Sequence, residues 1–255
     1  MSMTVNSGSQ IQNLSQQLST GRQINSAADN AAGLGIAQGL SAQERGLNQG
    51  TRNTADMQSL VNTAEGALSS INSNLQRLNE LALQSGNGIM NDRDRANIQR
   101  EVDQILDNIQ QTSQTTQFNT RNLLDGNATN LHTASSPDGS GMSVSIPGMS
   151  LESLGLEGFN VTENFDLSAI HNAMNMVNAA RGELGAVSNR MDYVMTSNDI
   201  TSLNLASARS RIEDTDMARA TTELASARVQ EQYQLAMQRQ DQEQLENQTQ
   251  RLFTF

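Results

Sequence analysis

The chain has 255 residues, of which 36% are hydrophobic and 3% aromatic, and its 27 acidic residues against 16 arginines and no lysine give a formal net charge of −11. So few aromatic residues argue against a large enzyme core, and the acidity argues against nucleic acid as a partner, because phosphate binding needs a basic face. The absence of cysteine excludes disulfides, thiolate metal sites and cysteine nucleophiles. No apolar run is long enough to span a membrane, and the first thirty residues lack a signal-peptide core, so we expect any export to avoid the general secretory route.

The N-terminal half predicts three helices. Residues 5–20 predict a short helix whose apolar positions are Val5, Ile11, Leu14 and Leu18. A heptad seam then predicts a helix over 39–85 that Gly86, Asn87 and Gly88 end, with seam positions Leu40, Leu47, Thr54, Met57, Val61, Ala64, Leu68, Ile71, Leu75, Leu78 and Ala82. A third helix is expected over 92–115, capped by Asn91 or Asp92, with one stripe of Ile98, Val102, Ile105 and Ile109.

The pattern changes over residues 118–164. Both prolines of the chain and six glycines lie there, and the alternation from Met142 to Ile146 is typical of a half-buried strand. We therefore expect a small β-hairpin with loops that packs on the helices.

A second long seam predicts a helix over 165–209. Its positions are Ile170, Ala173, Val177, Ala180, Leu184, Val187, Met191, Val194, Asn198, Thr201, Leu205, Ala208 and Ile212. Asn198 either fixes the register at some cost in stability or is satisfied by a neighbour. Helices with complementary apolar stripes bury one another, so the fold class is mainly α, an elongated antiparallel helical bundle or coiled coil with a small β-hairpin and paired terminal helices.

The C-terminal segment predicts one more helix with an apolar stripe of Met217, Leu224, Val229, Tyr233 and Met237. Residues 238–251 hold one apolar residue, Leu245, and Leu252, Phe253 and Phe255 could add a small anchor at the tip. The expected organisation is a terminal helix and connecting segment over 1–38, a rod-like core over 39–210, and a connecting segment with the C-terminal helix over 211–255.

The search for chemistry finds no catalytic set. His132 and His171 lie in different segments without a second ligand nearby, and Asp92 and Asp94 lack the spacing of a calcium loop. No nucleophile, base and orienting group can be assigned together, so the sequence predicts no enzyme, no cofactor and no metal.

Four stretches resemble bacterial flagellins. They are QLSTGRQINSAADNAAGLGIA at 17–37, AEGAL at 64–68 with LQRLNELA at 75–82, TQFN at 116–119 with LLDG at 123–126, and ARSRIEDTDMA at 208–218. The order along the chain is that of the family. The resemblance implies a short form without the variable outer domains, because only about forty residues separate the core helices. The tail from Gln230 onward is more polar than is usual in the family.

The resemblance also implies a function. Flagellins polymerise into the flagellar filament for motility, with their terminal helices as the inner layer. The chain is then expected outside the cell, exported unfolded through the flagellar export apparatus, with an export chaperone and cap proteins as partners beside its own copies. Its terminal helices would fold on assembly. The assembly candidates are Leu14, Leu18, Met217, Leu224, Val229, Tyr233 and Met237.

A receptor surface is implied as well. Gln76, Arg77, Glu80, Leu81 and Glu101 match the surface that the vertebrate Toll-like flagellin receptor engages. Two other functions remain open, namely a hook–filament junction subunit and a secreted immune ligand that forms no main filament.

Overall fold

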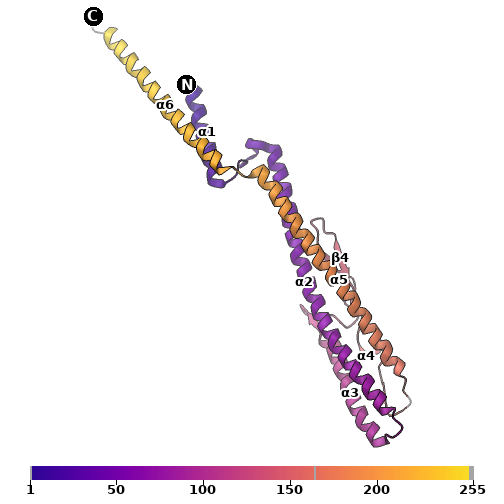
Figure 1. Cartoon of the computed structure of the whole chain (residues 1–255). Coiled ribbons are helices and arrows are strands. Elements are labelled where there is room, and N and C mark those ends of the chain that lie inside the picture. The colour runs from indigo at the N-terminus through magenta and orange to yellow at the C-terminus, as the bar shows by residue number, and fades with distance from the viewer. Residues whose placement is uncertain (1, 164, 253–255) are drawn as a thin grey trace. The chain divides into compact units, whose positions relative to one another are not determined.

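The computed structural model describes residues 2–163 and 165–252. Its elements in chain order are α1 (Ser2–Thr20), α2 (Ala27–Ser85), α3 (Asp92–Thr115), β1 (Gln117–Phe118), β2 (Arg121–Asn122), β3 (Leu131–Ala134), β4 (Gly141–Val144), α4 (Leu151–Leu154), α5 (Leu167–Glu213) and α6 (Met217–Leu252). The chain divides into two compact units (Figure 1). The terminal unit comprises the chain up to Glu44 and from Leu203, and the bundle unit is Arg45–Ser202.

The bundle unit is built on the antiparallel pairing of α2 with α5. Gln58 donates to Ser188 at 2.5 Å, and one heptad further along α2 Glu65 lies 3.6 Å from Arg181, one heptad earlier on α5. This matched spacing is that of an antiparallel pair in constant register. The part of α2 in this unit is about 60 Å long at 1.5 Å per residue, and α3 completes the bundle.

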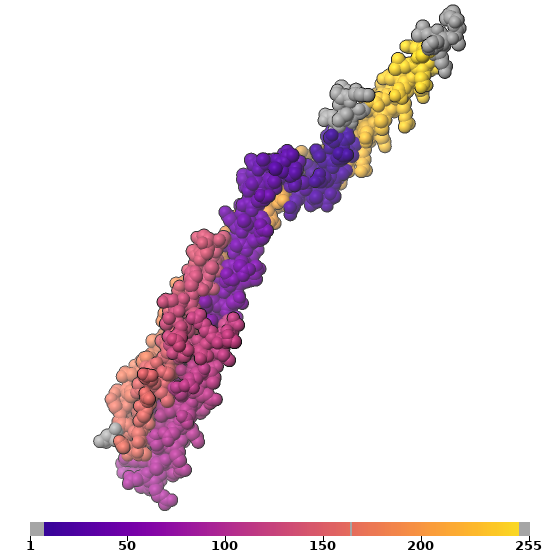
Figure 2. Space-filling view, turned by 180° about the vertical axis from the view of Figure 1, so that it is seen from behind, coloured from indigo at the N-terminus to yellow at the C-terminus, as the bar shows by residue number. Residues whose placement is uncertain are grey.

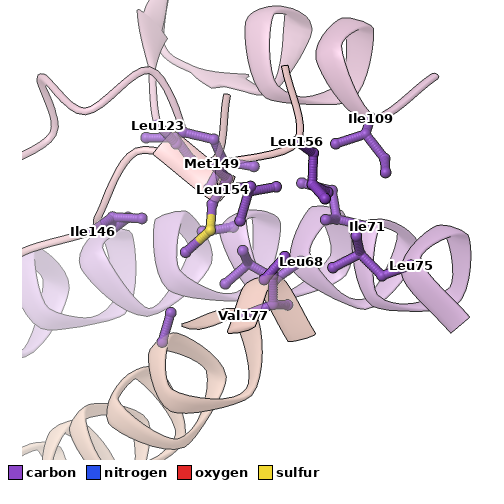
Figure 3. Packing of buried hydrophobic residues seen from close by; sticks show 14 of the residues in the cluster. Leu68, Ile71, Leu75, Ile109, Leu123, Ile146, Met149, Leu154, Leu156 and Val177 are labelled. Carbon is purple, nitrogen blue, oxygen red and sulfur yellow. The ribbon is translucent and has the colours of Figure 1, made fainter. Parts of the chain in front are cut away.

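The predicted seams form the core of the bundle unit. Val61, Ala64, Leu68, Ile71, Leu75 and Leu78 of α2 are fully buried with Ile170, Ala173 and Val177 of α5 and Val102 and Ile109 of α3. Figure 3 shows Leu68, Ile71 and Leu75 facing Ile109, Val177, Leu154 of α4 and the loop residue Leu156. Each fully buried aliphatic side chain contributes about 1.5–3 kcal/mol, so this core carries the stability of the unit. Toward the end of α5, Leu205, Ala208 and Ile212 are half-buried and Thr201 is exposed.

The segment after α3 holds two hairpins rather than the single one expected. β1 pairs with β2 across a turn in which Asn119 and Thr120 have positive φ, and β3 pairs antiparallel with β4, with Thr133 opposite Met142. The sequence analysis also missed α4, because a helix of four residues shows no periodicity. Ser150 caps its start and Gly155, in the left-handed conformation, ends it.

The second hairpin is fixed against both long helices. A Cβ on Gly50 of α2 would lie 2.2 Å from the Ser135 oxygen, so only glycine permits this approach. The Asn53 amide donates to the Ala134 oxygen at 3.0 Å, and the buried Asn198 of α5 donates to Ser135 at 2.8 Å. Asn198 is therefore satisfied by a neighbour, the second of the two alternatives. Figure 2 shows the rose-coloured hairpin segment against the purple part of α2.

Three predicted helices have different limits in the structure. α3 has the predicted bounds, with Asn91 as its cap in a capping box with Asp94. α2 instead begins at Ala27, well before residue 39, because Asp29 and Asn30 supply capping bonds that lie before the first heptad position. Asn30 is extended, and its side chain accepts the Gly33 amide at 2.8 Å, so the regular helix starts after it. α5 spans Leu167–Glu213 rather than 165–209, and α1 begins at Ser2 rather than at residue 5.

Candidate functional site

The two family-like stretches that flank the terminal helices meet in the terminal unit. Arg22 and Asp214 form an isolated antiparallel bridge. Around it the Gln23 amide donates to the Glu213 oxygen at 2.7 Å, and the Thr215 amide donates to the Gly21 oxygen at 2.9 Å. The Gln23 side chain adds a bond to the Ile212 oxygen at 2.8 Å. We call this pairing of residues 21–25 with 212–215 the junction.

Charges reinforce the junction. The Arg22 Nη1 lies 2.8 Å from Glu213 Oε1, and the carboxylate of Glu213 also lies 3.9 Å from Arg209 Nε. Arg209 in turn binds Glu44 of α2 at 2.7 Å. Glu213 is buried, so its charge depends on these cations, because an unpaired buried carboxylate would be costly. The network links α2, α5 and the segment after α1 within one unit.

Local hydrogen bonds and close packing hold the start of α2 next to the junction. Asp29 accepts from the Ser26 amide at 2.8 Å and the Asn25 amide at 3.0 Å, and the bonds to Ser26, chiefly that of its backbone amide, together with the Asn25 bond hold the pKa of Asp29 below its usual value. Gly33 leaves room for the buried Ile24, since a Cβ there would lie 2.7 Å from Ile24 Cδ1. The residues of the family-like stretch thus have local structural roles.

Beyond the junction, α1 and α6 lie side by side (Figure 1). Of the assembly candidates on α1, Leu14 is buried and Leu18 is half-buried. On α6 the buried residues are Ala220 and Ala227, one heptad apart, with Leu224 half-buried between them. A polar cleft of about 630 Å³ follows this contact, and its lining includes Gln17, Gln23 and Arg219.

The predicted apolar stripe of α6 is therefore not a single face, and this corrects the sequence analysis. Val229 and Tyr233 are 65% and 67% exposed, and Met217 and Met237 are exposed as well. At 100° per residue, Val229 and Tyr233 lie on the side of α6 away from Ala220 and Ala227, and Met237 lies next to them, about a right angle from the alanines. Small alanines face α1 because they allow close approach, but their small side chains give only a weak apolar signal in the sequence. We call Val229, Tyr233 and Met237 the outer face of α6.

The polar tail continues as helix. Residues 238–249 are exposed, including Leu245 and the carboxylates of Asp241, Glu243 and Glu246. The predicted tip anchor of Leu252, Phe253 and Phe255 lies outside the residues whose side chains the structure describes.

The receptor candidates lie in the bundle unit. Arg77 of α2 donates to Glu101 of α3 through Nε at 2.9 Å and Nη2 at 2.7 Å, and to Glu80 at 3.1 Å. These bonds, those to Glu101 first, raise the pKa of Arg77, and Gln76 is exposed beside it. Leu81 is only 1% exposed, so it belongs to the core and must be removed from the surface set. Heptad geometry places it one turn beyond the seam residue Leu78, on the buried side.

Metal and membrane sites are not found in the part of the chain that the structure describes. His132 and His171 are exposed and far apart in the sequence, and no three His, Cys, Asp or Glu residues among the described ones are grouped as metal ligands. Over the same residues, no helix is both long and apolar enough to cross a membrane.

The geometry defines an α-helical protein whose two terminal segments are joined at a junction and whose last helix carries an uncovered apolar face. Two family patterns match the sequence, the bacterial flagellin N-terminal helical region over residues 1–129 and the bacterial flagellin C-terminal helical region over residues 167–253. Together they cover most of the chain. This protein belongs to the bacterial flagellin family.

Individual relatives agree. The chain is 35% identical to a flagellin of Halalkalibacterium halodurans, over 93% of this chain and 89% of that protein, and 34% identical to a flagellin of Bacillus subtilis, over 91% and 89%. A solved structure of a putative flagellar hook-associated protein from Vibrio parahaemolyticus is 17% identical, with a TM-score of 0.61 over 73% of this chain and all of that one. At that identity the likeness concerns the fold alone.

Proposed function

We propose that this protein is a structural subunit that polymerises into a bacterial flagellar filament for motility. The observation that carries the proposal is the outer face of α6, where Val229, Tyr233 and Met237 stay uncovered in a single chain. A row of exposed apolar side chains on one helix is typical of a surface that another chain covers. The relatives named flagellin, and one named flagellar filament core protein from Brachyspira hyodysenteriae, support the same function.

The terminal helices fold fully only on assembly in this proposal. Among the side chains of α1 and α6 whose burial the structure describes, the buried ones are Leu14, Ala220 and Ala227, and alanine offers little apolar area. A pair of helices held so weakly is marginal alone, so contact with neighbouring copies supplies the missing burial. This agrees with export of the unfolded chain through the flagellar export apparatus to the cell exterior, with an export chaperone and cap proteins as transient partners.

The alternatives have less support. A hook–filament junction subunit would share the fold, as the Vibrio parahaemolyticus structure does, but the relatives of high identity are named flagellins and filament core proteins. If the protein were a secreted ligand that does not polymerise, nothing would cover the exposed apolar side chains on the outer face of α6. The relatives are named as flagellins and filament core proteins, which are structural proteins, and this also favours a protein that is not an enzyme.

Recognition by the vertebrate Toll-like flagellin receptor is a second proposal, carried by the exposed group of Gln76, Arg77, Glu80 and Glu101. Arg77 is held in place by two carboxylates from α2 and α3. A guanidinium oriented before binding loses little side-chain entropy in a complex, which suits an interface anchor.

Electron microscopy tests the main proposal. The purified full chain should form long filaments after a precipitating salt is added, and those filaments should sediment. A chain that stays monomeric, while a flagellin of known polymerisation assembles in the same buffer, would contradict the proposal and favour a secreted ligand that forms no filament.

A further inference from the structure

Asn87 and Gly88 form the only Asn-Gly pair in the sequence, and they lie in the turn between α2 and α3. Both residues are exposed, and the next residue, Ile89, is 86% exposed. The pair therefore lies in an open loop that water reaches, and an exposed turn can change its dihedral angles at little cost.

The hydrogen bonds of the turn leave one amide uncommitted. The Met90 amide donates to the Asn87 main-chain oxygen at 3.0 Å, and the Ile89 amide donates to Asn87 Oδ1 at 3.3 Å. Between them, the Gly88 amide makes no hydrogen bond to any residue that the structure describes. The nitrogen of Gly88 is thus free to attack Cγ of the Asn87 side chain. This attack is intramolecular and closes a five-membered ring.

We propose that Asn87 is a site of spontaneous deamidation. The Gly88 nitrogen, after losing its proton to hydroxide, attacks Cγ of Asn87 and closes a five-membered succinimide. The bond from Cγ to Nδ2 breaks, and Nδ2 leaves as ammonia. Water then opens the ring at either carbonyl, which gives aspartate or isoaspartate at position 87. One water is consumed and one ammonia released overall, and nothing is oxidised or reduced.

Two features of the turn favour this reaction. The Ile89 amide points at Oδ1, where negative charge develops as the ring closes, so it stabilises the intermediate as an oxyanion donor does. Glycine after asparagine has no Cβ to hinder the approach of the nitrogen. Asn91 provides a contrast, because its Oδ1 accepts the Asp94 amide in the capping box and the next residue begins α3.

The product changes the surface of the turn. A carboxylate appears at position 87, close in sequence to the N-terminus of α3, where the helix dipole favours negative charge. Isoaspartate would also lengthen the main chain by one methylene. The fold should tolerate both, since the turn buries neither Asn87 nor Gly88. The surface around Ile89 therefore becomes more acidic as the protein ages, whether or not the protein forms filaments.

Peptide mapping tests this inference on the intact protein. Samples are held at mildly alkaline pH, then cleaved after arginine, which releases residues 78–93 as one peptide holding Asn79, Asn87 and Asn91. We expect the mass gain of amide-to-acid conversion to accumulate at Asn87, with aspartate and isoaspartate separated by chromatography. Asn79 and Asn91 should remain amides and serve as internal controls.

Gly88→Ala is the matched variant. A Cβ at Gly88 would meet no atom within 4 Å, so this substitution leaves the fold intact while hindering the attack. The conversion at Asn87 should slow several-fold in Gly88→Ala and stop in Asn87→Gln. Equal rates in Gly88→Ala and the unmodified protein, or conversion at Asn91 ahead of Asn87, would overturn the inference.

Discussion

The guanidinium of Arg22 lies 2.8 Å from the carboxylate of Glu213, which joins the segment after α1 to the last turn of α5. The main chains of the same two segments are bonded through Gln23 and Glu213. The stretches at 17–37 and 208–218 that identify the family are thus the two sides of one contact.

Arg22→Ala should open the junction. The buried Glu213 loses its nearest cation and keeps only Arg209 at 3.9 Å, and a buried polar group left unsatisfied costs about 1–3 kcal/mol, with charged groups at the upper end or above. Hydrogen exchange should show faster exchange of the Gln23 and Thr215 amides. Arg219→Ala is the control, since the Arg219–Glu223 pair is exposed to solvent and such surface pairs contribute little to stability. If both variants exchange alike, the ion pair does not hold the junction.

Gly33→Ala should destabilise the start of α2. The new Cβ would lie 2.7 Å from Ile24 Cδ1 and 2.8 Å from Asn30 Nδ2, and overpacking of this kind costs about 1–3 kcal/mol. Gly35→Ala, two residues on, meets no atom within 4 Å and should stabilise the helix by up to about 1 kcal/mol. Urea denaturation followed by circular dichroism measures both, and changes of the same sign would show that the contact with Ile24 is not tight.

The long seams could be predicted from the sequence, because burial at Leu68, Ile71 or Val177 repeats every heptad over many turns. Periodicity locates a helix face but does not say which distant segment covers it. The Arg22–Glu213 contact therefore could not be predicted from spacing, although both residues lie in the stretches that resemble flagellins.

The α6 prediction was wrong for a related reason. Val229 and Tyr233 are the conspicuous apolar residues, yet Ala220 and Ala227 face α1. A heptad of alanines is a weak signal in the sequence, since alanine occurs on every face of a helix. The start of α2 was missed because its caps, Asp29 and Asn30, precede the first heptad residue.

The free energy of unfolding should fall at acid pH, and protonation of Asp29 should account for part of this loss. Backbone and side-chain bonds to Ser26, together with the Asn25 amide, lower the pKa of Asp29 in the folded protein. The folded state then binds fewer protons than the unfolded chain. The contribution of Asp29 to the free energy of unfolding is therefore complete above about pH 4, its pKa in the unfolded chain, and is lost as the pH falls through its lower pKa in the folded protein. Asp29→Asn should reduce this acid loss in melts recorded across that range. An unchanged pH profile in Asp29→Asn would mean that the capping bonds do not favour the charged form.

Arg77→Ala should weaken activation of the Toll-like flagellin receptor about tenfold if the guanidinium anchors the interface. Glu80 and Glu101 would also lose their shared partner. The readout is the dose response of receptor-reporter cells. Arg45→Ala, at another exposed position of α2, is the control and should leave the response unchanged. An unaltered response in Arg77→Ala would remove this residue from the receptor surface.

Assembly through the outer face of α6 is the central claim, and two truncations followed by sedimentation and electron microscopy test it most directly. Deletion of residues 252–255 keeps Val229, Tyr233 and Met237, each worth about 1.5–3 kcal/mol when fully buried, and should largely preserve filaments. Deletion of residues 230–255 removes Tyr233 and Met237 and should abolish them. Loss of filaments on deletion of 252–255 alone would place assembly at the tip and contradict this account.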